Sequence, residues 1–397
     1  MKILVINCGS SSLKYQLFNM DEGEVIAKGL VERIGNEGSR IEQDTKKGEY
    51  ENVTDIPDHN KAVELVFQAL TDKDHGVIKS LDEIGAIGHR VVHGGEKVKE
   101  SSLINDDIIK AIKEMIPFSP LHNPANLQGI EACRKMLPDK PNVACFDTSF
   151  HQTIPEHNYI YALPYELYEK YGIRRYGFHG ISHKFIANRA SELLGIPLEK
   201  LNIISCHLGN GSSITAIKNG KSYMTSMGLT PLAGLPMGTR SGDLDPSIVT
   251  FMLQNLKMTP EEVDSTLNKK SGVYGVSGKF SDFRDLDKGF EEGDKRCTLA
   301  LEIFYTKVRE TIGAYATMLD HIDAITFTGG VGENGPENRE GILRGLEILG
   351  VKLDKEVNNK RKPKEKVISS PDSKIKVMVI PTDEELMIAR DTQALVK

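Results

Sequence analysis

The sequence is poor in the residues that build disulfide scaffolds and aromatic surfaces. It has 397 residues, no tryptophan and only 6% aromatic residues. Its five cysteines are Cys8, Cys133, Cys145, Cys206 and Cys297. They form no Cys-x-x-Cys pair, and an odd number cannot all pair with one another. We therefore expect reduced thiols on small buried side chains, as is typical of the cytoplasm.

Long hydrophobic runs and an excess of positive charge are also missing. No run of about 18 apolar residues occurs, and the apolar stretch after Lys2 is too short for the core of a signal peptide. Lys and Arg number 50 against 56 Asp and Glu, a formal net charge of -6. We therefore expect a soluble cytoplasmic protein without a membrane or nucleic-acid partner. With 39% hydrophobic and 27% charged residues, the composition is that of a globular protein.

The length and a repeated pattern indicate two related domains. At roughly 100 to 200 residues per domain, two domains are expected. The opening strand runs into NCGSSS, and LNIISC later runs into HLGNGSS, so one outline occurs in both halves. A Pro-containing stretch after residue 150 has no sustained periodicity, as is typical of a domain boundary. We therefore place the domains at residues 1–150 and 151–383.

Hydrophobic periodicity predicts α/β structure in both halves. We expect strands at KILVIN, LKYQLF, EVIAKGLV, EIGAIGHRVV, NVACF, LNIISCHL, SSITAI, DAITFTGG and IKVMVIP. We expect helices at NKAVELVFQAL, INDDIIKAIKEMI, ISHKFIANRASELLG, DPSIVTFMLQNL, residues 291–319, PENREGILRGLEIL and EELMIARDTQAL. Asn105 is the expected cap of one helix, Gly195 follows the end of another, and Pro246 lies in the first turn of a third.

Three glycine-rich turns follow apolar strands: residues 7–12, 207–213 and 328–335. Gly, Asn and Ser tolerate tight turns and expose backbone N–H groups to an anion, so these turns predict phosphate binding. A hairpin without a ligand is the alternative for any single turn. The P-loop pattern is absent, because Thr215 stands where its first glycine belongs before Gly220-Lys221-Ser222.

Two other motif readings need to be considered. Gly330 to Gly335 fits G-x-G-x-x-G, with Asp354 some twenty residues on, which favours a dehydrogenase. Its place near the C-terminus leaves little room for a complete dinucleotide domain, and Glu333 would lie beside a pyrophosphate. His179 and His183 have the i, i+4 spacing of zinc-binding pairs, but position 180 is glycine and no third ligand is near in sequence.

Nine strings, taken in order, resemble the acetate kinase family over the chain from Lys2 to about Arg390. They are NCGSSSLKY, GHRVVHGGE, FDTSFH, YGFHGISH, HLGNGSS, MGTRSGDLDP, DFRD, TGGVGENG and PTDEE. The resemblance implies the actin, sugar-kinase and heat-shock-chaperone superfamily, with two duplicated actin-like (ribonuclease H-like) α/β domains flanking a nucleotide cleft. It also joins the C-terminal helix 384–397 to the first domain. The doubled motif is then explained, because each copy approaches the same polyphosphate.

The resemblance implies an activity and its partners. The expected reaction is reversible transfer of the γ-phosphoryl group of ATP to acetate, giving acetyl phosphate and ADP for acetyl-CoA biosynthesis. Mg²⁺ is the expected metal, with Mn²⁺ as a substitute, and the family forms homodimers. Phosphoryl transfer needs positioning and positive charge more than covalent chemistry by the protein.

The site residues are carried over from the matched strings. The implied catalytic residues are Asp147, His179 and Arg240. Arg90 is expected to orient the acetate carboxylate through two parallel N–H bonds, and a small apolar niche for its methyl group is implied at Val92, Leu121, Phe178 and Pro231. Asp147 is expected to organise Arg240 or metal-bound water, because acetate has no proton to lose at pH 7.

The nucleotide and metal positions follow in the same way. The implied nucleotide-binding residues are Ser10, Ser12, Lys14, His207, Leu208, Gly209, Asn210, Gly211, Asp282, Phe283, Arg284, Gly330, Val331, Gly332, Glu333 and Asn334. Asn7 and Glu384 are the implied metal positions, and their contacts need not be direct, because Mg²⁺ retains several waters. Most of these residues also have an ordinary structural reading, as core side chains, surface ion pairs or a charged first turn of a helix.

Two alternatives remain open beside the dehydrogenase. A propionate- or butyrate-preferring kinase would share every motif, because one methylene in an apolar pocket is worth only about 1 to 3 kcal/mol of discrimination. A nucleotide-driven switch or filament protein on the same scaffold would not need a carboxylate-binding arginine, yet Arg90 and its whole string are present.

Overall fold

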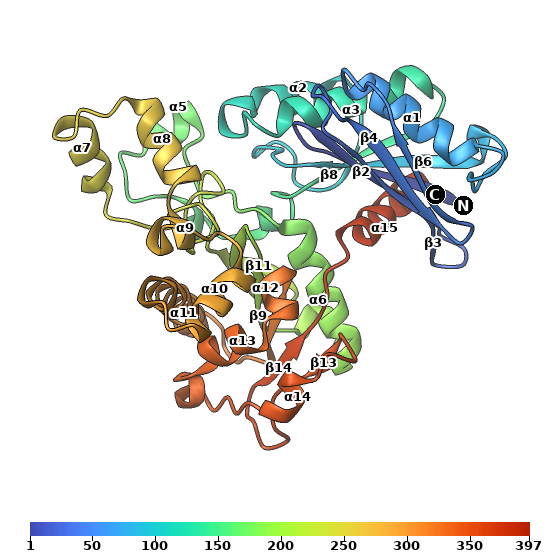
Figure 1. The fold of residues 1–397 in the computed structure, drawn as a ribbon. Helices are drawn as coiled ribbons and strands as arrows, with labels where there is room; N and C mark the ends of the chain where they lie inside the picture. The colour runs from blue at the N-terminus through green and yellow to red at the C-terminus, as the bar shows by residue number, and fades with distance from the viewer. The chain divides into compact units, whose positions relative to one another are not determined.

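The computed structural model describes residues 1–397, which form two compact units (Figure 1). The first unit contains Met1–Gln152 and Asp383–Lys397, and the second contains Thr153–Thr382. Each unit holds one β-sheet with helices packed on it, so the α/β class predicted from the sequence is confirmed. None of the helices combines the length and the apolar character that a membrane span requires.

The sheet of the first unit has eight strands. They are β1 (Lys2–Cys8), β2 (Ser12–Asn19), β3 (Glu24–Glu32), β4 (Arg40–Thr45), β5 (Gly48–Val53), β6 (Ile84–Val91), β7 (Ser102–Leu103) and β8 (Asn142–Phe146). Their order is β5-β4-β3-β2-β1-β6-β8-β7. The first five form an antiparallel meander, β6 and β8 run parallel to β1, and β7 is antiparallel to β8.

The sheet of the second unit has six strands. They are β9 (Ile203–Leu208), β10 (Ser212–Lys218), β11 (Lys221–Thr225), β12 (Ala324–Thr328), β13 (Lys366–Val367) and β14 (Lys376–Val379). Their order is β11-β10-β9-β12-β14-β13. The first three are antiparallel, β12 and β14 run parallel to β9, and β13 is antiparallel to β14.

The two sheets repeat one topology. In each, a three-stranded meander (β3-β2-β1 or β11-β10-β9) continues into two parallel strands (β6-β8 or β12-β14) and ends on a short antiparallel edge strand. The first sheet adds only β4 and β5 beyond its meander. The NCGSSS and HLGNGSS turns therefore occupy equivalent places, between the first and second strands of each sheet.

Helices cover both sheets. Those of the first unit are α1 (His59–Thr71), η1 (Leu81–Glu83), α2 (Asp106–Glu114), η2 (Ile116–Phe118), α3 (Asn123–Met136) and α15 (Glu384–Val396). The short helix η3 (Phe150–Thr153) contains the last residues of the first segment of this unit and the first residue of the second unit. Those of the second are α4 (Glu156–Tyr159), α5 (Glu166–Tyr171), α6 (Gly180–Leu194), η4 (Leu198–Lys200), α7 (Pro246–Gln254), α8 (Pro260–Lys269), α9 (Gly272–Ser277), α10 (Phe283–Glu291), α11 (Lys295–Ala316), α12 (Gly329–Asn334), α13 (Pro336–Leu343), η5 (Leu346–Leu349) and α14 (Lys355–Asn359).

The predicted helix ends are mostly confirmed. The Asn105 side chain accepts a hydrogen bond from the Ile108 N–H at 2.9 Å and caps α2. Gly195 ends α6 with φ of 65°, a left-handed conformation that favours glycine. The helix predicted over residues 336–349 is wrong in its second half, because Gly345 adopts φ of 95° and divides it into α13 and η5.

A helix that follows each sheet in the chain packs on the sheet of the other unit. The chain leaves β8 of the first sheet and forms α6, which packs on β9 of the second sheet. It leaves β14 of the second sheet and forms α15, which packs on β1, β6 and β8 of the first. The meander hides its Leu13, Tyr15 and Leu17 face in the core with α1, and α15 lies on the opposite face beside β1 (Figure 1).

Helix α3 was not predicted from the sequence, because its buried face carries two asparagines. The Asn126 amide donates to the Cys8 carbonyl at 2.8 Å and accepts from the Val92 N–H at 3.1 Å. The Asn123 amide bonds both the N–H and the carbonyl of His93. These buried amides hold together the segments that follow β1 and β6, where several predicted site residues lie.

Candidate active site

The turn between β9 and β10 brings together two predicted catalytic side chains of the second unit. A Cβ atom on Gly211 would lie 3.3 Å from His179 Nε2 and 3.8 Å from Arg240 Nη1. Glycine at this turn therefore keeps the space beside both groups open. His179 and Arg240 thus both border the turn that the sequence predicts to contact phosphate.

The His179 ring is held in a defined orientation at the start of α6. Its backbone is left-handed, with φ of 56°, a conformation that costs a non-glycine residue roughly 1–3 kcal/mol and is often found at functional sites. Its Nδ1 lies 2.9 Å from Ser213 Oγ. The ring stacks on His207 with the centroids 4.2 Å apart, and His207 Nδ1 lies 2.8 Å from Ser182 Oγ.

Arg240 is a cation without a carboxylate partner in its unit. Its guanidinium contacts the Pro231 carbonyl at 3.5 Å and the Met237 sulfur at 3.8 Å. Burial lowers the pKa of Arg240, but a guanidinium remains charged at any physiological pH. A partly buried positive charge with only weak partners is suited to receive an anion.

A pocket of about 540 Å³ collects three separate strings of the sequence. It is lined by Gly209 and Asn210 of the β9–β10 turn, Asp282 to Arg284 at the start of α10, and Gly330, Val331 and Asn334 of α12. All of these were predicted to contact the nucleotide. The structure therefore brings eight of the sixteen predicted nucleotide-binding residues to one cavity of the second unit.

The same pocket contains residues that sequence reasoning missed. Asp287, Gly335, Glu337 and Asn338 also line it. The Asn338 amide donates to Asp287 Oδ2 at 3.0 Å, and burial raises the pKa of Asp287 to about 6. Gly335 ends the TGGVGENG string, whereas no motif marks Asp287, Glu337 and Asn338, whose only signal is that they lie just after the DFRD and TGGVGENG strings.

Several predicted nucleotide-binding residues have other surroundings. Leu208 and Phe283 are buried in the core of the second unit, where Phe283 packs edge-to-face on Phe304. The Glu333 carboxylate turns back to accept hydrogen bonds from the Gly329 N–H at 2.9 Å and the Thr382 N–H at 3.2 Å. The Glu333 side chain therefore caps its own helix, which removes the concern about a carboxylate beside phosphate.

A fully buried arginine supports the α12 segment. Arg339 donates to the carbonyls of Gly332 at 2.8 Å and Glu333 at 3.0 Å, and to the Asn358 side chain at 2.8 Å. Burial without a carboxylate partner lowers its pKa to about 10. Because Arg339 donates to the carbonyls of Gly332 and Glu333, it holds the helix that lines the pocket in one conformation.

In the first unit, Arg90 at the end of β6 binds Asp147 just after β8. Arg90 Nη2 donates to Asp147 Oδ2 at 2.7 Å, and Nε donates to Oδ1 at 3.3 Å. Burial acts to lower the pKa of Arg90, but the negative charges of Asp147 and Glu384 raise it above its usual value. We expected Asp147 to organise Arg240 or metal-bound water, but its partner within this unit is Arg90.

Helix α15 reaches this pair because one glycine lets it approach the sheet. A Cβ atom on Gly88 of β6 would lie 2.5 Å from Thr392 Oγ1 of α15. The helix therefore lies close against the strand that ends in Arg90, and it places Glu384 in its first turn beside that residue. The Asp383 cap, which accepts from the Leu386 N–H at 2.8 Å, fixes where the helix begins.

The Glu384 carboxyl has an unusual electrostatic environment. Burial raises its pKa to about 7, with further increases from Asp147 and Glu385, while Arg90 and Lys14 act in the opposite direction. Asn7 is the cross-strand partner of Lys14 in the β1–β2 pair. Because Lys14 also acts on Glu384, the two predicted metal positions, Asn7 and Glu384, lie on the same face of this sheet.

The β1–β2 turn has the form expected of a phosphate-facing hairpin. The Gly9 N–H donates to the Ser12 carbonyl at 2.8 Å, which closes the turn and leaves Ser10 exposed. The equivalent Gly209 N–H of the second unit donates to the Gly211 carbonyl at 3.1 Å. Both turns therefore close on a glycine N–H, which bonds a carbonyl three residues later in the first turn and two residues later in the second.

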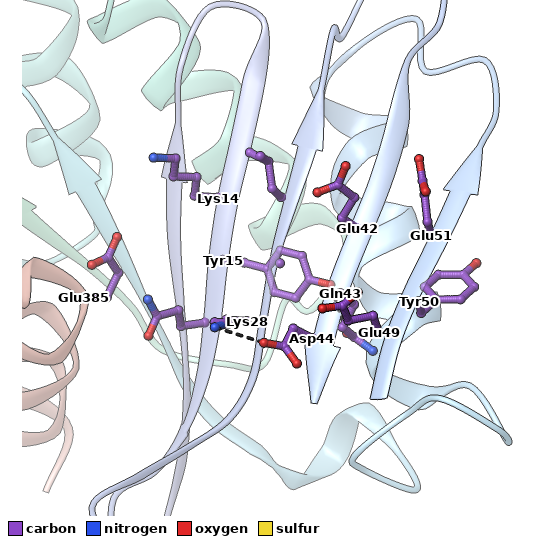
Figure 2. A pocket seen from close by; sticks show the side chains of 13 residues that line it. Lys14, Tyr15, Lys28, Glu42, Gln43, Asp44, Glu49, Tyr50, Glu51 and Glu385 are labelled. Atoms are coloured by element: carbon purple, nitrogen blue, oxygen red, sulfur yellow. Dashed lines mark hydrogen bonds and ion pairs between the residues drawn. The ribbon is translucent and has the colours of Figure 1, made fainter. Parts of the chain in front are cut away.

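A second cavity of about 730 Å³ lies on the outer meander of the first unit (Figure 2). Figure 2 shows Lys14 on β2 and Glu385 on α15 at one end of this cavity, and Tyr50 and Glu51 on β5 at the other. The lining contains two lysines against five carboxylates, Glu42, Asp44, Glu49, Glu51 and Glu385. This negative surface does not suit a polyphosphate, so the smaller pocket of the second unit is the better nucleotide site.

The residues predicted to form the methyl niche are divided between the units. Val92 is buried and Leu121 is 63% exposed in the first unit. Phe178 is buried beside His179 in the second unit, where Pro231 contacts Arg240 through its carbonyl. Their common role stays a prediction.

Comparisons with known proteins bear on this arrangement. A sequence model of the acetokinase family matches residues 2–390. The chain belongs to that family. It is 58% identical over 395 residues to an acetate kinase of Clostridium botulinum, covering 100% of this chain and 99% of the relative.

Two solved structures have the same fold. The chain matches the acetate kinase of Porphyromonas gingivalis at a TM-score of 0.95 with 48% identity, covering 100% of both chains. It matches a propionate kinase of Francisella tularensis at a TM-score of 0.92 with 42% identity, covering 99% of both. Membership of this family excludes the dehydrogenase reading, and the Gly330–Gly335 pattern accordingly lies in a helix of a mixed sheet fold.

Proposed function

We propose that this protein is an acetate kinase, which transfers the γ-phosphoryl group of ATP reversibly to acetate. One carboxylate oxygen of acetate bonds to the γ-phosphorus while the bond from that phosphorus to the β–γ bridging oxygen breaks, and ADP leaves with the electron pair. No proton has to leave acetate. The observation that carries the proposal is the Gly211 turn, where His179 and Arg240 border the same space, in a chain 58% identical to an acetate kinase.

The positive groups have separate tasks in this proposal. Arg240 and His179 stabilise the charge that spreads over the equatorial oxygens of the transferred group. Arg90 orients the acetate carboxylate, and Asp147 holds the Arg90 guanidinium in place through two hydrogen bonds. Because Arg90 Nη1 takes no part in that pair, it can still donate to a carboxylate.

The nucleotide is assigned to the pocket of the second unit. Its 540 Å³ volume falls in the range of small-molecule sites. Backbone groups of Gly209 and Gly330 line one part of it and suit phosphate, while Arg284 and Asp282 at the start of α10 suit the nucleoside. Lys14 and the Ser10–Ser12 turn of the first unit are proposed to contact the terminal phosphates.

The metal positions fit Mg²⁺ by their chemistry. Asn7 and Glu384 supply hard oxygen donors, and Mg²⁺ needs only one or two from the protein. Burial, with smaller contributions from Asp147 and Glu385, raises the pKa of Glu384, and a divalent cation would offset the charge of its ionised form. When bound, Mg²⁺ or Mn²⁺ offsets the negative charge of the phosphates. Removal of divalent metal should abolish turnover, and addition of Mg²⁺ should restore it.

A propionate- or butyrate-preferring activity is the second candidate. We retain this alternative because the chain is also similar to a propionate kinase. Comparing acids from formate to butyrate separates the two, because the apolar niche should favour one chain length. The highest kcat/KM with acetate supports the first proposal, and a maximum at propionate or butyrate favours the second.

The protein is further proposed to be a cytoplasmic homodimer. Helix α7 is rich in apolar residues but buries none of them, and Phe251 is 53% exposed. An exposed apolar surface of this kind marks an interaction site. The five cysteines are free and buried, as expected, and burial raises the pKa of the Cys8 thiol to about 12. Light scattering should give twice the 44.0 kDa chain mass, and Phe251→Glu should shift it toward the monomer.

Trapping of the product tests the activity. Purified protein with MgATP and acetate should accumulate an acyl phosphate that hydroxylamine converts to a hydroxamate. Reactions without acetate, and with the Arg240→Ala variant, should give only background. A folded protein that forms no hydroxamate above the acetate-free control would falsify the proposal.

A further inference from the structure

His183 is a buried histidine that the proposed reaction does not use. It lies on α6, four residues after His179, which caps the start of that helix. Its Nδ1 lies 2.9 Å from Ser205 Oγ and its Nε2 lies 2.8 Å from Ser213 Oγ. His183 is completely buried, and in the neutral form of its ring one nitrogen donates and the other accepts.

Ser213 joins this histidine to the catalytic one. Its Oγ also lies 2.9 Å from His179 Nδ1, so a single hydroxyl stands between two imidazole rings. A serine hydroxyl carries one hydrogen. It can therefore donate to only one of the two histidines, and it accepts from any histidine to which it does not donate.

Two arrangements differ in where they leave the proton of neutral His179. In one, Ser205 donates to His183, His183 donates to Ser213, and Ser213 donates to His179 Nδ1, which leaves the His179 proton on Nε2. In the other, every bond is reversed and His179 Nε2 carries a lone pair. Nε2 faces the Gly211 turn beside Arg240. Phosphoryl oxygens are acceptors, so only the first arrangement presents a donor to them.

We propose that His183 is a positioning residue which, through Ser213, keeps the proton of neutral His179 on Nε2 and aims it at the transferred phosphoryl group. The proposal rests on the proposed function, because it assigns a purpose to the Nε2 proton. The ring of His207 stacks on His179 and supports it from one face, and Ser182, which contacts His207 Nδ1, also lies 2.8 Å from Thr382 Oγ1.

The test reads the tautomer of His179 directly. Protein with ¹⁵N-labelled histidine, free of nucleotide and at neutral pH, is examined by long-range ¹H–¹⁵N correlation, with His179 assigned from its absence in a His179→Asn variant. The wild type should show a protonated Nε2 and an accepting Nδ1. Ser213→Ala and His183→Leu should each convert this into a mixture of the two neutral tautomers.

Kinetics separate positioning from simple stability. Loss of one oriented hydrogen bond should lower kcat about tenfold in Ser213→Ala and His183→Leu, with both KM values within about twofold of wild type. His183→Gln keeps an amide N–H able to donate to Ser213, so it should restore a single tautomer and most of kcat. Thr215→Val is the matched control, because it removes a buried hydroxyl of the same strand that lies 2.9 Å from Thr225 Oγ1.

Several results would overturn the proposal. The proposal fails if wild-type His179 is protonated at Nδ1, or if its tautomer is unchanged in both Ser213→Ala and His183→Leu. It also fails if His183→Gln and His183→Leu have equal effects on the tautomer and on kcat. An equal effect of Thr215→Val would also overturn it. If one variant fails to fold, the other and the wild-type spectrum still decide. The spectrum needs no substrate, so its failure is distinct from a failure of hydroxamate trapping.

Discussion

Gly88 of β6 and Ile388 of α15 come so close that a Cβ atom on the glycine would lie 2.7 Å from Ile388 Cγ2. The contact joins two parts of the chain that lie far apart in sequence. It determines how near the first turn of α15, with Glu384, comes to Arg90. The position of a predicted metal ligand therefore depends on the absence of one methyl group.

Gly88→Ala should destabilise the protein by about 1–3 kcal/mol, because the added methyl group overpacks the strand against α15. The Mg²⁺ concentration needed for half-maximal activity should rise as Glu384 shifts. Thermal unfolding and metal titration measure the two effects. Gly313→Ala is the control, because a Cβ there meets nothing within 4 Å, and a glycine-to-alanine change inside α11 should stabilise by about 0.5–1 kcal/mol. A fully stable Gly88→Ala protein would contradict the packing described.

Asp147→Asn should lower kcat/KM for acetate by about 10²-fold, because the asparagine leaves the Arg90 guanidinium without its charged partner and loosens its orientation. KM for MgATP should change by less than about twofold, since the nucleotide pocket belongs to the second unit. Steady-state kinetics with each substrate varied in turn test this. Glu114→Gln, which removes an exposed ion pair with Lys97 in the same unit, should have no kinetic effect. Equal losses for both substrates would argue against an acetate-positioning role.

Glu384→Gln should change how stability depends on pH. The folded-state pKa of Glu384 is raised to about 7 by burial, above the ordinary value of 4.5. Between these values the folded state holds a proton that the unfolded state has lost, so wild-type stability falls as pH rises through this window. The variant has no such proton and should lose this part of the decline. The unfolding midpoint of metal-free protein at pH 5 and pH 8 measures it.

Glu131→Gln is the control for this effect. Glu131 is an exposed carboxylate on α3 in the same unit, and its removal should leave the pH dependence as in wild type. Glu384→Gln should also raise the Mg²⁺ requirement in the activity assay. A variant whose midpoint declines with pH as steeply as that of wild type would show that Glu384 is ionised throughout the range.

Arg240→Ala should lower kcat by about 10³-fold or more, because a guanidinium that acts on the transferred phosphoryl group contributes mainly in the transition state. Nucleotide affinity, measured by calorimetry with MgADP, should change little. Arg344→Ala removes an exposed arginine of the same unit paired with Glu302 and should leave both values near wild type. Equal losses in kcat and in nucleotide affinity would make Arg240 a binding residue.

Local patterns along the chain predicted much of this molecule. The alternation of Leu13, Tyr15 and Leu17 predicted a strand, and the helical spacing before Gly195 predicted a helix. Both patterns depend only on near neighbours in the chain, and the structure confirms both elements. The repeated strand and glycine turn indicated two related halves, and the two sheets repeat one topology. The resemblance of nine strings indicated the family, which the comparisons confirm.

The rest required the tertiary structure, because it depends on contacts between distant segments. Helix α3 has no strong apolar stripe, since its buried Asn123 and Asn126 hydrogen-bond groups of other segments, among them His93 and the Cys8 carbonyl. No local pattern could show that Asp147 binds Arg90. Likewise, only the fold shows that Asp287 joins the nucleotide pocket. The sequence by itself determined which residues can bind or catalyse. The packing of the helices on the two sheets decided which of these residues come together.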